Sequence, residues 1–277
     1  MWSQNQGQPP TSHHRQSTTM SDFSLPSAVN SPSNRQPLTS VLLESSPSAY
    51  EVATHAPFLI AAGKGRVSKS LLSRWLAQDR LYAQAYIGFI GALIARVDLP
   101  YVFVKDKSAS LRWRIVHMLS SALSNIHHEL DFFANVATRY GLDLDCPPRP
   151  DVYFTADVAT KQYIDLFRAF WTDPSMSLME GLVVLWATEQ CYLTAWRFAA
   201  QGLSESDSRR EDDQDGGALR QEFIPNWTSS AFEQFVKEIA EVTNLLADRE
   251  DAWRNIQVYK AVWQHILDIE KRFWPEM

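Results

Sequence analysis

The sequence contains little cysteine, no long apolar run and no excess of positive charge. Among its 277 residues only Cys146 and Cys191 are cysteines, too few for a disulfide framework, and no Cys-x-x-Cys or Cys/His cluster indicates a zinc site. The formal net charge of −6 argues against nucleic acid or an anionic membrane as the main partner. The apolar runs are too short and too interrupted to cross a bilayer. We therefore expect a cytoplasmic protein whose partners include neither nucleic acid nor membrane.

The first 46 residues also contain few large apolar side chains. They are rich in Ser, Pro, Gln and Asn, and they have no apolar core of the kind that a secretory signal requires. Because such a segment cannot bury enough surface to offset the entropy of ordering, residues 1–46 are predicted to be a disordered tail, followed by a helical domain over residues 47–277. An acidic, Gly-containing stretch at about residues 203–220 predicts a solvated insertion loop within that domain.

Helical periodicity fills most of the rest of the chain. Apolar residues recur at spacings of three and four, and no stretch alternates as a strand does. Gly141 is typical of a helix end, while Ser177 with Glu180, and Ser230 with Glu233, have the spacing of N-terminal capping boxes. The expected fold class is all-α. The predicted helices cover about residues 68–97, 108–140, 156–171, 177–201, 230–247 and 251–274.

Three acidic residues interrupt the apolar stripes of three different helices. Asp79, Glu189 and Glu270 each have apolar neighbours three and four residues away, so each carboxylate points in the same direction as the core-facing side chains. An ionised carboxylate in a core costs several kcal/mol unless it is paired, hydrogen-bonded or protonated. Two explanations stay open: each residue is a satisfied structural acid, or the three together form one buried polar pocket.

Aromatic residues accompany these acids and favour the pocket. Aromatic walls suit a flat heteroaromatic ligand, and a carboxylate can hold its ring nitrogen and exocyclic amine. A second carboxylate with a raised pKa can serve as general acid or base. An aromatic stripe alone, however, is more often plain core. The aromatic candidates are Trp75, Tyr82, Tyr86, Tyr163, Trp186, Tyr192, Trp227, Trp263 and Phe273.

A metal centre is the third explanation for such acids in a bundle. Glu129 offers a fourth inward acid, which would resemble a carboxylate-bridged di-iron site. Those bundles need Glu-x-x-His on two helices, and no histidine lies three positions beyond any of the acids. The residues at those positions are Tyr82, Phe132, Tyr192 and Phe273. Neither a metal nor another cofactor is therefore expected.

The order of several motifs resembles the TenA/thiaminase II family. The resemblance covers about residues 50–274. It implies a heme-oxygenase-like multi-helix bundle, commonly a homo-oligomer, that hydrolyses aminopyrimidines derived from thiamine and releases ammonia or, in thiaminase II activity, a thiazole. The motifs are His55-Ala-Pro-Phe58, Ala77-Gln-Asp79-Arg-Leu-Tyr82, Leu185-Trp-Ala-Thr-Glu189-Gln-Cys-Tyr192-Leu-Thr-Ala-Trp196, Trp227-Thr-Ser-Ser-Ala-Phe232 and Glu270-Lys-Arg-Phe-Trp274.

The resemblance also implies roles for individual residues. Asp79 would hold the aminopyrimidine, Tyr82 would line its site, and Glu270 would be the acid/base that transfers protons. Trp227 stands where the family usually has a tyrosine. Tyr86 and Tyr163 belong to the aromatic residues noted above and complete the predicted substrate-binding set.

The sequence departs from the family at its nucleophile. The position of the catalytic cysteine is occupied by Thr188, and Cys191 lies about 200° around the helix from Glu189, so it is expected to face away as an inert thiol. The chain thus looks closer to the branch without the cysteine, in which Glu189 would act beside Glu270. We expect a cysteine-independent aminopyrimidine hydrolase of thiamine salvage. The alternative is a non-catalytic pyrimidine-binding or interaction protein that keeps the pocket.

Overall fold

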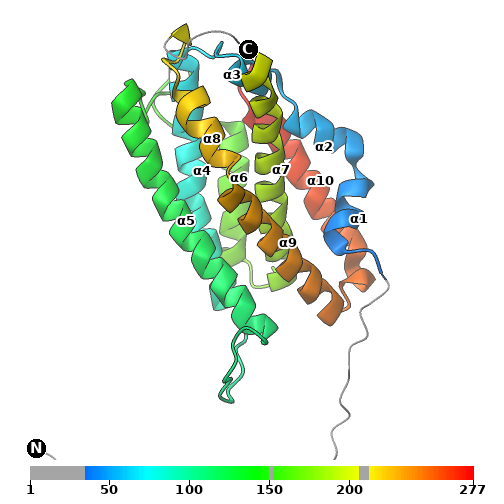
Figure 1. Cartoon of the computed structure of the whole chain (residues 1–277). Coiled ribbons are helices and arrows are strands. Elements are labelled where there is room, and N and C mark those ends of the chain that lie inside the picture. Colours follow the sequence, from blue (N-terminus) through cyan, green and yellow to red (C-terminus); the bar gives the residue numbers. More distant parts are fainter. Residues whose placement is uncertain (1–34, 150–151, 206–211) are drawn as a thin grey trace, which may run out of the picture. The chain divides into compact units, whose positions relative to one another are not determined.

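A computed structural model describes residues 35–149, 152–205 and 212–277, and these ranges contain helices and no strand (Figure 1). The all-α fold expected from the sequence is confirmed. None of the described helices combines the length and the apolar composition needed to cross a bilayer. The helices are α1 (Leu38–Ser45), α2 (Pro47–Thr54), α3 (Pro57–Gly63), α4 (Lys69–Ala95), α5 (Leu111–Tyr140), α6 (Val158–Thr172), α7 (Leu178–Glu205), the π-helical turn η2 (Leu219–Phe223), α8 (Ile224–Trp227), α9 (Ser230–Arg249), the 3₁₀ turn η3 (Ala252–Asn255) and α10 (Ile256–Phe273).

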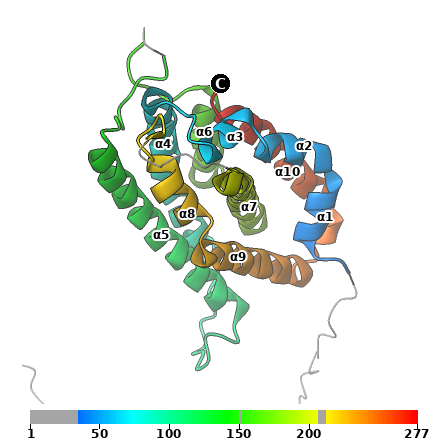
Figure 2. The same cartoon turned by 45° about the horizontal axis from the view of Figure 1, so that its top comes forward.

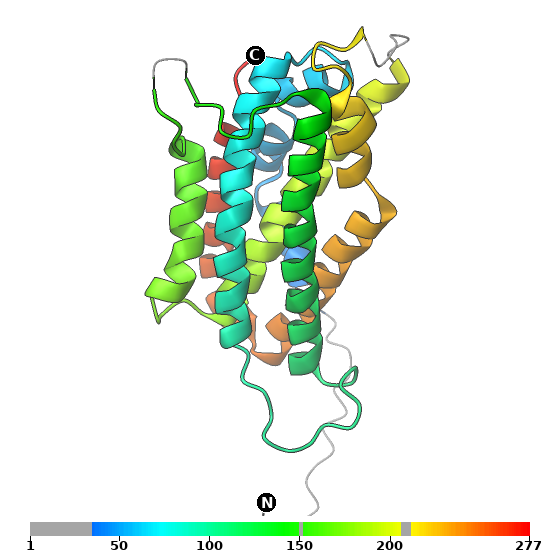
Figure 3. The same ribbon diagram turned by 90° about the vertical axis from the view of Figure 1, so that its left-hand side faces the viewer.

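Helix α7 runs through the middle of the bundle, and the other helices surround it (Figure 2). Residues 182–188 are buried without interruption, which is typical of a helix that is covered on every side. Helix α7 packs against α3, α9 and α10, whereas α4 packs against α5 and α6. Figure 3 shows α4 and α5 running side by side. This arrangement brings side chains of α4, α5 and α7 toward a common space.

Two of the predicted helix ends have the expected chemistry. Gly141 follows α5 in the left-handed region, with φ of 64°, a conformation that glycine adopts without strain. At the start of α7 the backbone N–H of Glu180 donates to Ser177 Oγ over 3.1 Å, and the backbone N–H of Ser177 donates to Glu180 Oε2 over 3.0 Å. The capping box predicted at Ser177 is therefore confirmed.

The second predicted capping box is displaced by one residue. Ser229, not Ser230, precedes α9 and accepts a hydrogen bond from the backbone N–H of Phe232 over 3.2 Å. Glu233 instead forms ion pairs with Arg197 and Lys237. Ser229 and Ser230 are adjacent, and the spacing of Ser230 from Glu233 predicted the wrong one of the two as the capping residue.

The N-terminal boundary of the folded part is earlier than predicted. Residues 38–45 form α1, although disorder was expected through residue 46. Leu38 and Leu42 are buried, and Asn244 of α9 exchanges hydrogen bonds with the backbone N–H and the hydroxyl of Thr39, each over 3.0 Å. A short helix that is weak by itself is thus stabilised by tertiary packing. Residues 1–34 of the predicted tail lie outside the described residues.

The prediction that the acidic insertion is a solvated loop is also wrong for residues 212–220, the part of the insertion that the structure describes. The carboxylate of Asp213 pairs with the guanidinium of Arg220, and both side chains are buried. Asp215 accepts hydrogen bonds from the backbone N–H groups of Gly217 and Leu219, at 2.9 and 2.8 Å. Composition predicted exposure, but these acids satisfy internal donors. Residues 206–211 lie outside the described residues.

Candidate ligand-binding site

A cavity of about 410 Å³ opens between α4, α5, α7, α8 and the start of α9. Its mouth is lined by the exposed residues Asn125, His128 and Ala231, and its inner wall includes the buried residues Phe133 and Trp227. The lining is mainly apolar and aromatic, and within the described residues it contains no lysine or arginine. A cavity of this size and character is suited to a small aromatic ligand.

Two acids predicted from helical periodicity, Asp79 and Glu189, line this cavity. Each accepts a hydrogen bond from a tyrosine: Tyr192 donates to Asp79 Oδ2 over 2.9 Å, and Tyr86 donates to Glu189 Oε1 over 2.7 Å. Asp79 Oδ1 and Glu189 Oε2 have no hydrogen-bond partner within the described residues. Each acid therefore has one oxygen fixed by the protein and one left for a ligand.

A third acid, Glu129 of α5, lines the same cavity. The indole N–H of Trp227 donates to its Oε1 over 2.5 Å, and the side-chain amide of Asn226 donates to its Oε2 over 3.2 Å. Within the described residues no group of three or more His, Cys, Asp or Glu side chains is arranged to hold a metal ion. Within the described residues, the hydrogen-bond partners of Glu129 are thus the indole of Trp227 and the amide of Asn226, both on α8.

Glu270 of α10 lies behind the cavity wall and does not line it. It is only 3% exposed, and the hydroxyl of Tyr163 donates to its Oε1 over 2.6 Å, while its Oε2 is buried without a partner in the described residues. The ring of Tyr82, which does line the cavity, packs against Tyr163 with ring centroids 5.0 Å apart. Tyr82 therefore connects the cavity to the Tyr163–Glu270 pair.

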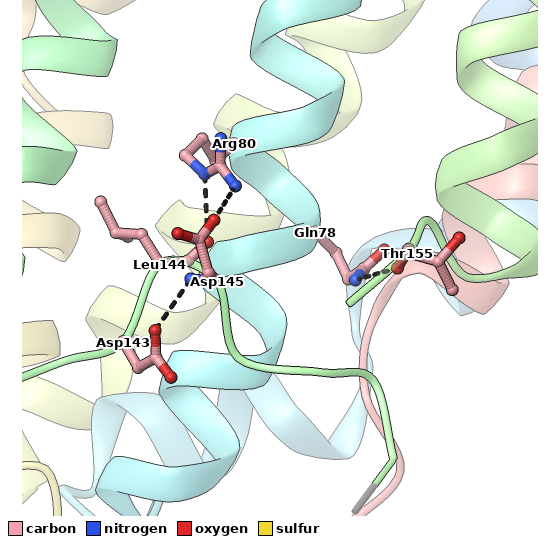
Figure 4. Close-up of polar contacts among 6 residues, drawn as sticks. All are labelled: Gln78, Arg80, Asp143, Leu144, Asp145 and Thr155. Atoms are coloured by element: carbon pink, nitrogen blue, oxygen red, sulfur yellow. Dashed lines mark hydrogen bonds and ion pairs between the residues drawn. The ribbon is translucent and has the colours of Figure 1, made fainter. Parts of the chain in front are cut away.

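The turn of α4 that carries Asp79 is held to the connector between α5 and α6 by hydrogen bonds from the residues before and after Asp79. Gln78 donates from Nε2 to the carbonyl oxygen of Thr155 over 3.0 Å (Figure 4). Arg80 donates from Nε to the carbonyl oxygen of Leu144 over 3.0 Å and pairs with Asp145 over 2.6 Å (Figure 4). The residues on either side of Asp79 thus hold this turn in place.

Burial raises the pKa of all four acids. It raises the pKa of Glu129, Glu189 and Glu270 to about 7 in each case, against an opposing hydrogen bond from Trp227, Tyr86 or Tyr163. The pKa of Asp79 is also well above its usual range, first through burial and then through the negative charges of the other three acids. At neutral pH the cluster therefore holds both protonated and ionised carboxyl groups, as proton transfer requires.

Neither the hydroxyl of Thr188 nor the thiol of Cys191, both on α7, is positioned to act as a nucleophile in the cavity. Thr188 is buried outside the cavity lining, and its hydroxyl donates to the carbonyl oxygens of Val184 and Leu185 at 3.2 and 3.0 Å. Cys191 is buried and also lies outside the lining, and burial raises the pKa of its thiol well above the usual range. Because neither Thr188 nor Cys191 lines the cavity, its carboxylates are the candidate reactive groups.

A model of the TENA/THI-4/PQQC family matches residues 47–277. The chain belongs to this family. Its fold is similar to that of a TenA homologue from Pyrococcus furiosus, with a TM-score of 0.67, 20% sequence identity and coverage of 86% of this chain and 98% of that one. A TenA homologue from P. horikoshii gives a TM-score of 0.65 at 12% identity and covers 86% of this chain and 97% of that one. These likenesses confirm the fold implied by the sequence motifs.

Two curated relatives differ in how much of their own length this chain matches. A probable transcription factor from Fusarium pseudograminearum is 29% identical in an alignment 233 residues long, and the match covers 74% of this chain but 44% of that protein. The chain thus spans less than half the length of this relative. A probable bifunctional TENA-E protein from Glycine max is 19% identical over 226 residues, 81% of this chain and 86% of that protein.

The structure brings five of the seven predicted site residues of this family member into the cavity lining. They are Asp79, Tyr82, Tyr86, Glu189 and Trp227. Tyr163 and Glu270 do not join them: they form the buried pair behind Tyr82. Helical periodicity gives the face on which a residue lies, and both residues do face inward. It does not give the depth at which another side chain covers them.

Sequence reasoning assigned no ligand-binding role to Glu129, which was considered only as a metal ligand, and it missed Asn226, Phe232 and Phe235 of the lining. The apolar neighbours of Glu129 along α5 signalled an inward acid, and the aromatic residues after Trp227 signalled a wall. Only the tertiary arrangement shows that these signals belong to the same cavity.

Proposed function

We propose that the protein is a cysteine-independent aminopyrimidine hydrolase of thiamine salvage. The observation that carries this proposal is one aromatic-walled cavity into which Asp79 and Glu189 each direct a carboxyl group with an unused oxygen. Membership of the TENA/THI-4/PQQC family supports a thiamine-related role at the level of the family. The acidic lining, without lysine or arginine in the described part, suits a neutral or cationic ligand and disfavours a phosphate ester.

Asp79 is the group proposed to orient the pyrimidine. When protonated it can donate to a ring nitrogen and accept from the neighbouring exocyclic amine, because a carboxylic acid carries both a donor and an acceptor. Tyr82, Tyr86 and Trp227 provide aromatic surfaces against which the flat ring can pack. The fastening of α4 around Asp79 keeps this orientation fixed, which lowers the entropic cost of reaching the transition state.

Glu189 is the proposed acid/base of the reaction. Its pKa of about 7 allows it to lose or gain a proton near neutral pH. In the hydrolysis of an aminomethyl pyrimidine, water forms a bond to the methylene carbon, the bond from carbon to the amine breaks, and Glu189 passes the proton from water to the departing ammonia. Glu270 reaches the cavity only by way of Tyr82 and is proposed as a second proton carrier.

The experiment is a hydrolysis assay with aminomethyl- and formylaminomethyl-aminopyrimidine as substrates. Formation of the hydroxymethyl or the deformylated product, followed by chromatography, supports the proposal. Tight binding of these pyrimidines without turnover of either would reject the enzyme and favour the pyrimidine-binding alternative. That alternative is supported by Thr188, which stands in place of the nucleophile and whose hydroxyl donates to the backbone carbonyl oxygens of Val184 and Leu185.

Two further properties belong to the same proposal. A homo-oligomer is proposed by analogy with the family, and light scattering of the full chain in solution tests it. A cytoplasmic location is proposed because both cysteines are free. Microscopy of the full-length protein, tagged at its C-terminus, tests the location.

A further inference from the structure

Glu129 has different hydrogen-bond partners from the other acids of the cluster. Its two oxygens accept from the indole of Trp227 and the amide of Asn226, both through N–H groups. An indole N–H can only donate, whereas a tyrosine hydroxyl can donate or accept. The tyrosines beside Asp79 and Glu189 are therefore compatible with either protonation state of those acids. The two N–H donors at Glu129 favour its ionised form and oppose the effect of burial on its pKa.

The charge of Glu129 has no cationic partner in the described lining of the cavity. Apart from His128, the other titratable side chains of the lining are Asp79, Tyr82 and Tyr86 of α4 and Glu189 and Tyr192 of α7, while α8 and α9 contribute none. The adjacent His128 lies exposed at the mouth. A partly buried carboxylate without a cation stabilises whatever positive charge enters beside it. The cavity is thus arranged for a ligand that brings this charge.

We propose that Glu129 is a specificity-determining residue, which makes the cavity prefer aminopyrimidines with a positively charged substituent over neutral ones with the same ring. This inference rests on the proposed function of the cavity as an aminopyrimidine site. Both oxygens of Glu129 are held by the protein, so the residue acts mainly through its charge, which is effective over several ångströms in a poorly hydrated cavity. Asp79 and Glu189 keep their free oxygens for the ring and the reacting group.

Two ligands that share the pyrimidine ring but differ in the charge of its substituent test this proposal. The aminomethyl pyrimidine carries an ammonium group, and its N-formyl derivative is neutral. Their dissociation constants are measured by titration calorimetry at about pH 8, above the pKa of about 7 of Glu129. The wild type is expected to bind the aminomethyl compound more tightly. In Glu129→Gln the ratio of the two constants should fall by about tenfold, because the ammonium loses a nearby opposite charge.

Glu222→Gln is the matched control. Glu222 lies on η2 outside the cavity lining, so the same loss of one negative charge there should leave the ratio unchanged. If Glu129→Gln fails to fold, Asn226→Lys decides instead, because a cation placed beside Glu129 compensates its charge and should also lower the ratio.

Each remaining outcome overturns a defined statement. If both compounds bind the wild type and the ratio is the same in Glu129→Gln, or in Asn226→Lys where Glu129→Gln does not fold, the role of Glu129 is rejected and the proposed function stands. If neither compound binds, both are rejected.

Discussion

Asp213 and Glu189 are both acidic side chains inside the same helical bundle, but their partners differ in kind. Asp213 pairs with the guanidinium of Arg220, and the neighbouring Asp215 accepts two backbone N–H groups. Glu189 has one tyrosine hydroxyl and shares its cavity with two further acids and no described lysine or arginine. In the first region the buried charge is neutralised by the protein itself. In the second it is left for a proton or a ligand.

This difference separates structural acids from candidate functional acids. A buried charge with a complete set of partners has no further chemistry to offer, and removing a partner is costly. A buried acid with a free oxygen and a raised pKa makes the folded state less stable than it would be with a neutral side chain. Such a cost persists where it serves a reaction or a ligand.

The largest expected effect is in the neutralised region. Arg220→Met leaves Asp213 buried without its cation and should lower the free energy of unfolding by about 3–5 kcal/mol, measured by urea denaturation. The control Arg139→Met removes a pair with Glu222 in which the arginine is 60% exposed, and it should cost less than about 1 kcal/mol. Equal losses in the two variants would show that burial does not distinguish these ion pairs.

In the cavity, the same kind of change should affect activity and not stability. Glu189→Gln keeps the volume and one acceptor oxygen for Tyr86 but removes the proton carrier, so the rate of aminopyrimidine hydrolysis should fall by about 10²-fold or more. Its thermal midpoint should equal or exceed that of the wild type. A variant that hydrolyses the substrate at the wild-type rate would remove Glu189 from the mechanism.

The pH dependence of stability sharpens the comparison. In the folded state Glu129, Glu189 and Glu270 have a pKa of about 7, above the ordinary value of 4.5, so between these two values the folded chain binds more protons than the unfolded chain. The free energy of unfolding should therefore decrease as pH rises through this window and level off above it.

Glu270→Gln tests this sign. Because the amide does not ionise, the variant should lose less stability than the wild type between about pH 5 and pH 8, as measured by urea denaturation at both values. A steeper loss in the variant would mean that Glu270 is ionised and stabilising in the folded protein.

The smallest effect is expected at Thr188. Thr188→Val replaces a hydroxyl that donates to the preceding helical turn, and such a bond contributes little. Hydrolysis should stay within about threefold of the wild-type rate, since the hydroxyl is not proposed to react. A loss comparable to that of Glu189→Gln would instead identify Thr188 as a nucleophile.

Much of the scaffold could be predicted from the sequence because its signals are local. The apolar spacing of α4, α5 and α7 gave their positions, and it placed Asp79 and Glu189 on inward faces. The first turn of α7 was likewise given by Ser177 and Glu180. These features depend on residues within a few positions of each other, so they survive without knowledge of the fold.

The remaining features depend on contacts between distant residues. Leu38 and Leu42 form a helix only because α9 and the core receive them, and Asp213 is buried only because Arg220 folds back onto it. The short helix α8 follows a π-helical turn that no periodicity announces, yet it supplies Asn226 and Trp227 to Glu129. Depth, as at Glu270, is likewise a property of the assembled bundle.

The Asp213–Arg220 pair also anchors the chain within the acidic insertion. Gly65 lies against it, where a Cβ would come within 2.2 Å of Asp213 Oδ1, and its carbonyl oxygen accepts from the backbone N–H of Gln214 over 3.0 Å. Chain inserted between Glu205 and Asp212 therefore meets this anchor before it reaches α8. The pair, together with the Gly65–Gln214 hydrogen bond, thus fixes the chain ahead of the helix that carries Trp227.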